Sequence, residues 1–157
     1  MHEIIIIGTV PPCPRCKLLT DVVTEKAKKL ELIVNIQHIS YTSEEAAELA
    51  ERAGLKPGTA KDVAKIIGQD ISLEKMPKAS ELSELDYIKN LEPEMMQFES
   101  LFREVYILDN WLRNFENRAK AVGILMTPAL VIDGEIKYNG SVPDLSLINE
   151  LLGELKR

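Results

Sequence analysis

The feature that most constrains the fold is the order of patterns in residues 1–40. An unbroken run of isoleucines, Ile4 to Ile7, is followed by Cys13-Pro-Arg-Cys16 and then by apolar residues at helical spacing. The run predicts a central strand buried on both faces, and the spacing predicts a helix from Pro14 to about Lys29. Residues 32–39 are again aliphatic and predict a second strand. Strand, cysteine pair, helix and strand in this order are typical of a parallel βαβ connection.

The end of the chain predicts a β-hairpin and a final helix. Residues 129–132 and 135–138 have strand patterns, and the Asp133-Gly134 pair between them suits a two-residue turn. Gly140 is expected to break the second strand, and Pro143 suits the first turn of a helix. The apolar stripe of that helix consists of Leu145, Ile148, Leu152 and Leu155.

Residues 41–119 are expected to be helical throughout. Start signals for four helices are Thr42, which forms a capping-box pattern with Glu45, and then Thr59, Ser80 and Pro93. The third helix would present Leu82, Leu85 and Ile88 on one side, and the fourth Leu101, Val105, Leu108, Leu112 and Phe115. We therefore expect a helical insertion over 41–119, with residues 1–40 plus 120–157 forming one compact unit.

Net charge and the length of the longest apolar run argue against several functional classes. The 157 residues carry a net charge of −6, which argues against a nucleic-acid-binding or anionic-membrane-binding surface. The longest aliphatic run, Ile4 to Ile7, is far too short to span a bilayer. The first residues show no signal-peptide pattern, so a cytoplasmic protein is expected.

The two cysteines point to reactivity rather than to structure. A disulfide scaffold would distribute cysteines along the chain, and a zinc site would need ligands beyond this single pair. Cys13 is expected at the start of a helix, where unpaired N–H groups and the helix dipole favour a thiolate. Cys16, one turn later, is placed to resolve a mixed disulfide. Arg15 either adds a charge that favours the thiolate or is a solvated surface residue.

These residues resemble the thioredoxin and glutaredoxin superfamily, most of all its small bacterial and archaeal thioredoxin-like proteins. A second motif, Gly123-Ile124-x-x-x-Pro128-Ala129-Leu130, is similar to the stretch that precedes the cis proline of thioredoxins. The resemblance covers residues 2–40 and 120–157. It implies an α/β thioredoxin-like fold, with a mixed four-stranded sheet, flanking helices and an all-helical insertion after the second strand. It also implies a cis bond between Thr127 and Pro128, facing the cysteines.

The active-site motif departs from both parent families. Pro14 directly after the first cysteine is similar to glutaredoxins, but Arg15 replaces their tyrosine. The segment Asn139-Gly140-x-x-x-Asp144 resembles their glutathione-binding segment only loosely. The resemblance therefore implies dithiol chemistry without implying the use of glutathione.

The function implied is thiol–disulfide oxidoreduction. Cys13 would attack, Cys16 would resolve, and Thr127, Pro128, Pro14 and Arg15 would form the substrate-binding surface. The partners would be protein disulfides and an electron donor that the sequence does not identify, without nucleic acid or membrane. No cofactor or metal is needed, because the dithiol itself carries two electrons.

Several alternatives stay open at this stage. The cysteine pair is also compatible with a metal-binding module, either a Cu(I) chaperone or an iron–sulfur-bridged dimer, and the fold is compatible with a redox-inactive adaptor. His38 is interpreted as a core or edge residue rather than as a catalytic base. The insertion is either a structural cap or a wall beside Cys13 and Pro128 that selects one partner.

Overall fold

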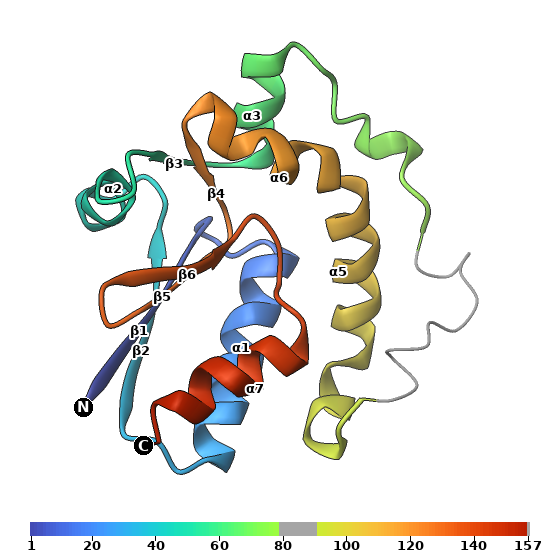
Figure 1. Cartoon of the computed structure of the whole chain (residues 1–157). Coiled ribbons are helices and arrows are strands. Elements are labelled where there is room, and N and C mark those ends of the chain that lie inside the picture. Colours follow the sequence, from blue (N-terminus) through green and yellow to red (C-terminus); the bar gives the residue numbers. More distant parts are fainter. Residues whose placement is uncertain (79–90, 157) are drawn as a thin grey trace.

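The computed structural model describes residues 1–78 and 91–156 (Figure 1). Within these residues, four strands form a mixed sheet in the order β2-β1-β5-β6. Strand β1 (His2–Gly8) is central, with β2 (Val34–Ser40) parallel on one side and β5 (Ala129–Ile132) antiparallel on the other. Strand β6 (Glu135–Asn139) completes the sheet beside β5. The predicted α/β thioredoxin-like fold is confirmed.

Strand β1 is buried on both faces, as its isoleucine run predicts. Ile4 and Ile6 pack on the face covered by helix α1 (Pro14–Lys29) and helix α7 (Leu145–Glu154). Ile5 and Ile7 pack on the opposite face, against helix α2 (Glu44–Glu51). Alternation along a strand therefore gives each face of the sheet its own apolar cluster.

Helix α1 has the bounds that its pattern predicts. Pro14 occupies the first turn, where its missing N–H costs nothing, and three lysines in the last turn complement the helix dipole. The C-terminal hairpin is also confirmed, because Asp133 and Gly134 both have positive φ and connect β5 to β6. Helix α7 begins later than predicted: Asp144 is its N-cap, so Pro143 precedes the helix.

The segment 41–119 is not helical throughout. A short strand, β3 (Lys56–Gly58), pairs in parallel with β4 (Ile124–Met126) in a second, two-stranded sheet. Pro57 and Gly58 disfavour a helix here. The backbone groups of the segment bond to the C-terminal flanking half, residues 120–157, instead, since Lys56 N donates to Gly123 O at 2.9 Å and Thr127 N donates to Gly58 O at 2.9 Å.

The helix signals in this segment were right in part. Ser43, not Thr42, caps α2, since its hydroxyl accepts a hydrogen bond from the backbone of Ala46. Helix α3 (Ala60–Ile67) begins with a capping box at Thr59 and ends at Gly68 in the left-handed region, as expected. The third predicted helix, with Ser80, Leu82, Leu85 and Ile88, lies outside the described residues.

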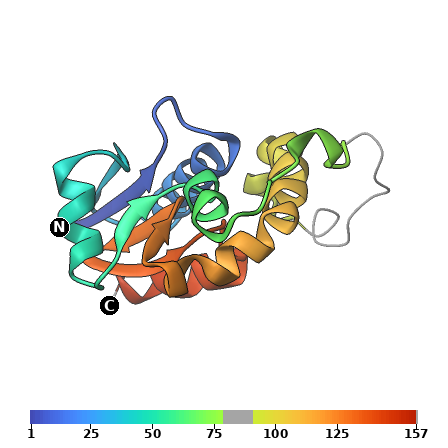
Figure 2. The ribbon, with the colours of Figure 1, turned by 90° about the horizontal axis from the view of Figure 1, so that it is seen from above.

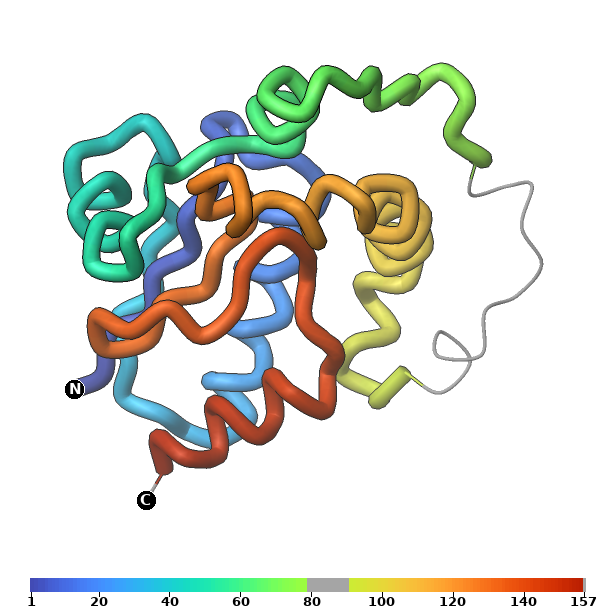
Figure 3. Tube along the Cα trace, turned by 45° about the horizontal axis from the view of Figure 1, so that its top comes forward, coloured from blue at the N-terminus to red at the C-terminus, as the bar shows by residue number. Residues whose placement is uncertain are grey.

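The fourth predicted helix is divided into three elements. A 3-10 helix η3 (Pro93–Phe98) leads into α5 (Glu99–Trp111), and α6 (Arg113–Ala119) follows after a break at Leu112. Two short 3-10 turns, η1 (Leu73–Lys75) and η4 (Lys120–Val122), complete the described elements. Figure 3 follows the chain from α2 to α3 and then, after residue 90, from α5 through α6 into β4.

The described parts of segment 41–119 contribute to each of the apolar clusters that residues 1–78 and 91–156 form. Met95, Phe102 and Val105 join the cluster on the α1 face, and α2 covers the opposite face. Helices α3 and α6 form a third cluster together with Ile124 and Met126 of β4. Figure 2 shows α2 and α5 on opposite sides of the molecule, with the sheet and α1 between them. The described parts of the segment therefore pack around the two flanking halves, residues 1–40 and 120–157.

Candidate redox site at the start of helix α1

The two cysteines lie at the start of helix α1, after the loop that follows strand β1. A loop of five residues follows Gly8, and Cys13 is the N-cap of the helix. Thr9 shapes this loop, because its hydroxyl accepts a hydrogen bond from Cys13 N at 2.9 Å and donates one to Pro11 O at 3.1 Å. Val10, Pro11 and Pro12 are exposed, so the loop presents an apolar surface next to Cys13.

The two sulfurs have very different surroundings. They are 3.3 Å apart and hydrogen-bonded, Cys13 is partly exposed, and Cys16 is fully buried. The hydrogen bond from Cys16 lowers the pKa of Cys13 to about 5 against the opposing effect of burial, with help from backbone N–H groups and from Arg15. The same bond and burial raise the pKa of the Cys16 thiol far above its usual value. At neutral pH, Cys13 is thus the thiolate and Cys16 the thiol.

Gly8 lets the central strand approach the dithiol. A Cβ atom on Gly8 would lie 2.4 Å from Cys16 Sγ, a distance that no real Cβ atom occupies. Any larger residue at this position would displace the sulfur or the strand. The sequence shows Gly8 only as the end of an aliphatic run, so it does not reveal this packing role.

The Thr127–Pro128 peptide bond is cis, as the resemblance implied. Both residues are buried, and Pro128 directly precedes Ala129, which pairs with Ile7 near the end of β1. The sheet register therefore places Pro128 at the same end of the sheet as the loop that leads from β1 to the cysteines. Pro14, in the first turn of α1, is partly exposed. Whether Thr127, Pro128 and Pro14 bind a substrate stays a prediction.

Arg15 lies in the protein interior, not on the surface expected for a substrate contact or a solvated charge. Its side chain is 5% exposed, and its Nε donates to Asp109 Oδ1 at 2.7 Å. Its Nη2 donates to the carbonyl of Gly140. The guanidinium points inward because a buried carboxylate and a carbonyl are there to satisfy its donors.

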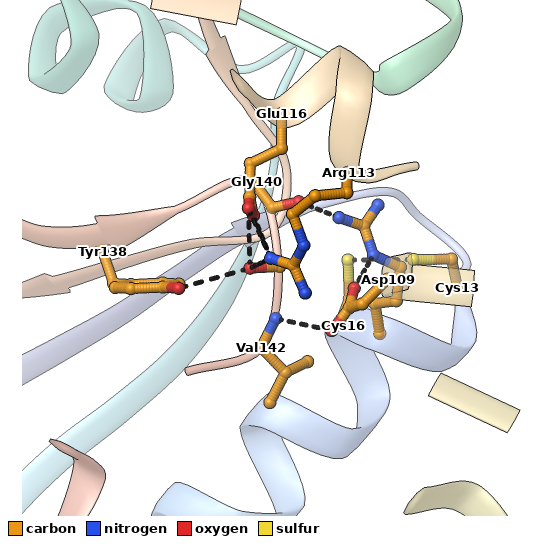
Figure 4. Close-up of polar contacts among 10 residues, drawn as sticks. Cys13, Cys16, Asp109, Arg113, Glu116, Tyr138, Gly140 and Val142 are labelled. Atoms are coloured by element: carbon orange, nitrogen blue, oxygen red, sulfur yellow. Dashed lines mark hydrogen bonds and ion pairs between the residues drawn. The ribbon is translucent and has the colours of Figure 1, made fainter. Parts of the chain in front are cut away.

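Asp109 is the partner that the sequence did not reveal. It lies on α5, 94 positions along the chain from Arg15, and its second oxygen accepts a hydrogen bond from Val142 N at 3.1 Å (Figure 4). Burial raises the pKa of Asp109 against the opposing charge and hydrogen bond of Arg15. Asp109 interrupts an otherwise apolar helix face, which is the one local signal that could have marked it.

Gly140 connects the cis proline to this ion pair. Its N–H donates to Pro128 O at 3.0 Å, and its carbonyl accepts from Arg15. It has a φ of +92°, and a Cβ atom here would lie 2.6 Å from the Cγ of Glu116. Strand β6 ends at Asn139, so Gly140 breaks the strand as predicted and also contacts the site.

Residues 1–78 and 91–156 contain no group of three or more His, Cys, Asp and Glu side chains that could hold a metal ion. Over the same ranges, no helix combines the length and the apolar character that crossing a bilayer requires.

Comparison with known proteins gives one match. A family model described as thioredoxin domain matches residues 112–153, which include Pro128, the hairpin and most of α7 but not the cysteine pair. Searches of curated proteins and of solved structures found no match. The family match covers the C-terminal part of the sequence, and the cysteine pair lies near its N-terminus, at the start of α1. Together they support a thioredoxin-like assignment for the chain.

Proposed function

We propose that this protein is a thiol–disulfide oxidoreductase that acts on the disulfide of a partner protein. The observation that carries the proposal is the asymmetry of the two sulfurs. One is partly exposed with a pKa of about 5, and the other is buried 3.3 Å away with a raised pKa. An accessible thiolate beside a protected thiol is the arrangement that disulfide exchange requires.

The reaction has two exchange steps. The Cys13 thiolate attacks one sulfur of the substrate disulfide, the substrate S–S bond breaks, and the first substrate thiolate leaves. Cys16 then loses its proton and attacks Cys13, which releases the second substrate thiolate. The substrate gains two electrons, and the protein is left with a Cys13–Cys16 disulfide. A donor dithiol must reduce that disulfide before the next turnover.

The substrate chain is proposed to lie across the cis proline. Thr127 and Pro128 directly precede Ala129, which pairs with Ile7 near the end of β1, and Pro14 with the exposed residues Val10 to Pro12 belongs to the loop and first helical turn that follow β1. Main-chain groups of an extended peptide suit such a surface. A reducing cytoplasm is the compartment in which we place this reaction.

The test is to follow both cysteines by alkylation and disulfide reduction. Iodoacetamide at neutral pH should label Cys13 first, with a rate that is half-maximal near pH 5, because the reactive thiolate increases as pH rises through the pKa. Cys13→Ser should abolish reduction of a small disulfide, and Cys16→Ser should accumulate a mixed disulfide. Faster labelling of Cys16, or tight retention of Cu(I) without disulfide reduction, would contradict the proposal.

A further inference from the structure

A buried nitrogen without a partner lies close to the resolving cysteine. His38 is on β2 and shares the side-chain alternation of Val34 and Ile36, which pack on the α1 face of the sheet. Its ring is partly buried, and its Nε2 atom is shielded from solvent and makes no hydrogen bond. Buried polar atoms are almost always paired, so an orphaned imidazole nitrogen calls for an explanation.

The distance between this nitrogen and the sulfur of Cys16 can be bounded from Gly8, which lies next to both atoms. A Cβ atom on Gly8 would lie 2.4 Å from Cys16 Sγ and 2.9 Å from His38 Nε2. These two distances add to an upper limit of about 5.3 Å between the sulfur and the nitrogen. That separation is within the reach of one bridging water or a small movement of the ring, as is common before a substrate binds.

Other polar groups near the dithiol already have partners. The Asp109 carboxylate is bonded to Arg15 and to Val142 N, and the Thr9 hydroxyl is bonded to Cys13 N and Pro11 O. Among the described residues, the other shielded atom without a hydrogen bond is Glu92 Oε2, which lies against the ammonium of Lys26. Of these groups, His38 Nε2 is the one near Cys16 that makes no hydrogen bond.

We propose that His38 Nε2 accepts the proton of the Cys16 thiol in the second step of disulfide exchange. The inference rests on the proposed function and adds a proton acceptor to it. With the Nδ1–H tautomer, the S–H bond of Cys16 breaks and an Nε2–H bond forms, directly or through one water. The Cys16 thiolate then attacks Cys13, the bond between Cys13 and the substrate breaks, and the departing substrate thiolate takes a proton from solvent or from the imidazolium.

The need for such an acceptor follows from the protection of Cys16. Burial disfavours the thiolate form of Cys16, so the thiol needs a base to supply the attacking thiolate. In the mixed disulfide, Cys13 is no longer a thiolate, so it no longer accepts the hydrogen bond that the Cys16 thiol donates. The proton must then go elsewhere, and His38 Nε2 is the described acceptor in reach.

The experiment mixes an excess of reduced protein with a chromogenic aryl disulfide, so that attack by Cys13 and attack by Cys16 are seen as two separate releases of aryl thiolate. The first aryl thiolate reports attack by Cys13, at a rate proportional to protein concentration. The second reports attack by Cys16, at a rate independent of concentration. His38→Gln should leave the first phase unchanged and slow the second about a hundredfold, the low end of general base catalysis. In His38→Ala, added imidazole should restore part of the second phase.

The control is Gln37→Ala, an exposed neighbour on the same strand, which should change neither phase. A normal second phase in His38→Gln would overturn the inference and leave the proposed function standing. Equal slowing of both phases, without rescue by imidazole, would show a structural role and also overturn it. If the wild-type protein releases neither thiolate, the proposed function itself fails. Should His38→Gln not fold, His38→Asn takes its place.

Discussion

The two described parts of the segment 41–119 support the flanking halves, residues 1–40 and 120–157, in different ways. The first part, residues 41–78, places Ala46, Leu49 and Ala50 against the sheet face opposite α1. The second part, residues 91–119, packs Phe102 and Val105 on the α1 face and adds Asp109, which binds Arg15 between the two cysteines. The first part thus contributes apolar burial, whereas the second also contributes a charge to the active-site helix.

This difference shows that the number of residues between a segment and the cysteine pair does not determine whether the segment contacts the residues around that pair. Residue 41 is adjacent to the redox centre, since Tyr41 N donates to Gly8 O at 2.8 Å, yet α2 continues to the far face. Helix α5 begins far along the chain, yet it reaches the residue between the cysteines. We therefore expect the second part to affect both stability and reactivity, and helix α2 of the first part to affect stability alone.

The largest expected effect follows from removing both parts. Replacing residues 42–119 with a short Gly/Ser loop would expose Ile5, Ile7 and Leu125 and would leave Arg15 without its carboxylate. Burial of that apolar surface is worth several kcal/mol, comparable with the whole stability of a small domain. We expect no cooperative thermal unfolding transition by circular dichroism. A shortened protein that unfolds cooperatively and reduces a small disulfide normally would show that the flanking halves fold by themselves.

The outcome also decides between the two interpretations of the insertion. If the shortened protein fails to fold, segment 41–119 is part of the core, and selection of one partner loses its support. If it folds but loses a partner that is trapped with a Cys16→Ser variant, the segment selects substrates.

The next effect comes from the ion pair of the second part. Asp109→Ala leaves a buried guanidinium without its charge partner, which costs about 3–5 kcal/mol of unfolding free energy. The matched control is the double variant Arg15→Met with Asp109→Leu, which removes both charges. It should recover most of that loss, because two apolar side chains carry no uncompensated charge. Urea denaturation measures both, and equal losses in the two variants would contradict a dominant role of the charge.

Much of the fold was predictable because its elements are local and periodic. The isoleucine run, the stripe of α1 and the Asp133-Gly134 turn each define an element without reference to the rest of the chain. Strand β3 was missed because it has only three residues, with Pro57 and Gly58 among them, and depends on β4 for its hydrogen bonds. A strand formed by a distant partner leaves little trace in its own residues.

The site was predictable in its cysteines but not in their supports. The spacing of Cys13 and Cys16 and the helical pattern that follows them are enough to predict a reactive cysteine pair at the start of a helix. Arg15 was expected toward the surface because no pattern pairs it with Asp109 on a separate helix. His38 and Gly8 acquire their significance only when the parallel register of β1 and β2 and the start of α1 bring them together.

A smaller effect is expected from the first part of the segment. Leu49→Ala deletes a buried side chain from α2, and we expect a loss of about 2 kcal/mol, the low end for such changes, because a short helix at the periphery can relax. The pKa of Cys13 should stay near 5, since no charge near the sulfur is altered. Glu48→Ala, exposed on the same helix, is the matched control and should be neutral. A change in the alkylation profile of Leu49→Ala would erase the distinction between the two parts.

The smallest effect concerns how strongly the second part tunes the thiolate. The hydrogen bond from Cys16 is the largest cause of the lowered pKa of Cys13, and the charge of Arg15 is a lesser one. Cys16→Ala should therefore move the half-maximal pH of Cys13 alkylation far toward the usual thiol range near 8.5. Arg15→Met with Asp109→Leu should move it in the same direction but by less, because Arg15 no longer favours the anion. Mass spectrometry of the Cys13 peptide follows the reaction in both variants. If the double variant shifts the profile as far as Cys16→Ala does, the ion pair rather than the neighbouring thiol holds the thiolate, and helix α5 controls the chemistry as well as the stability of α1.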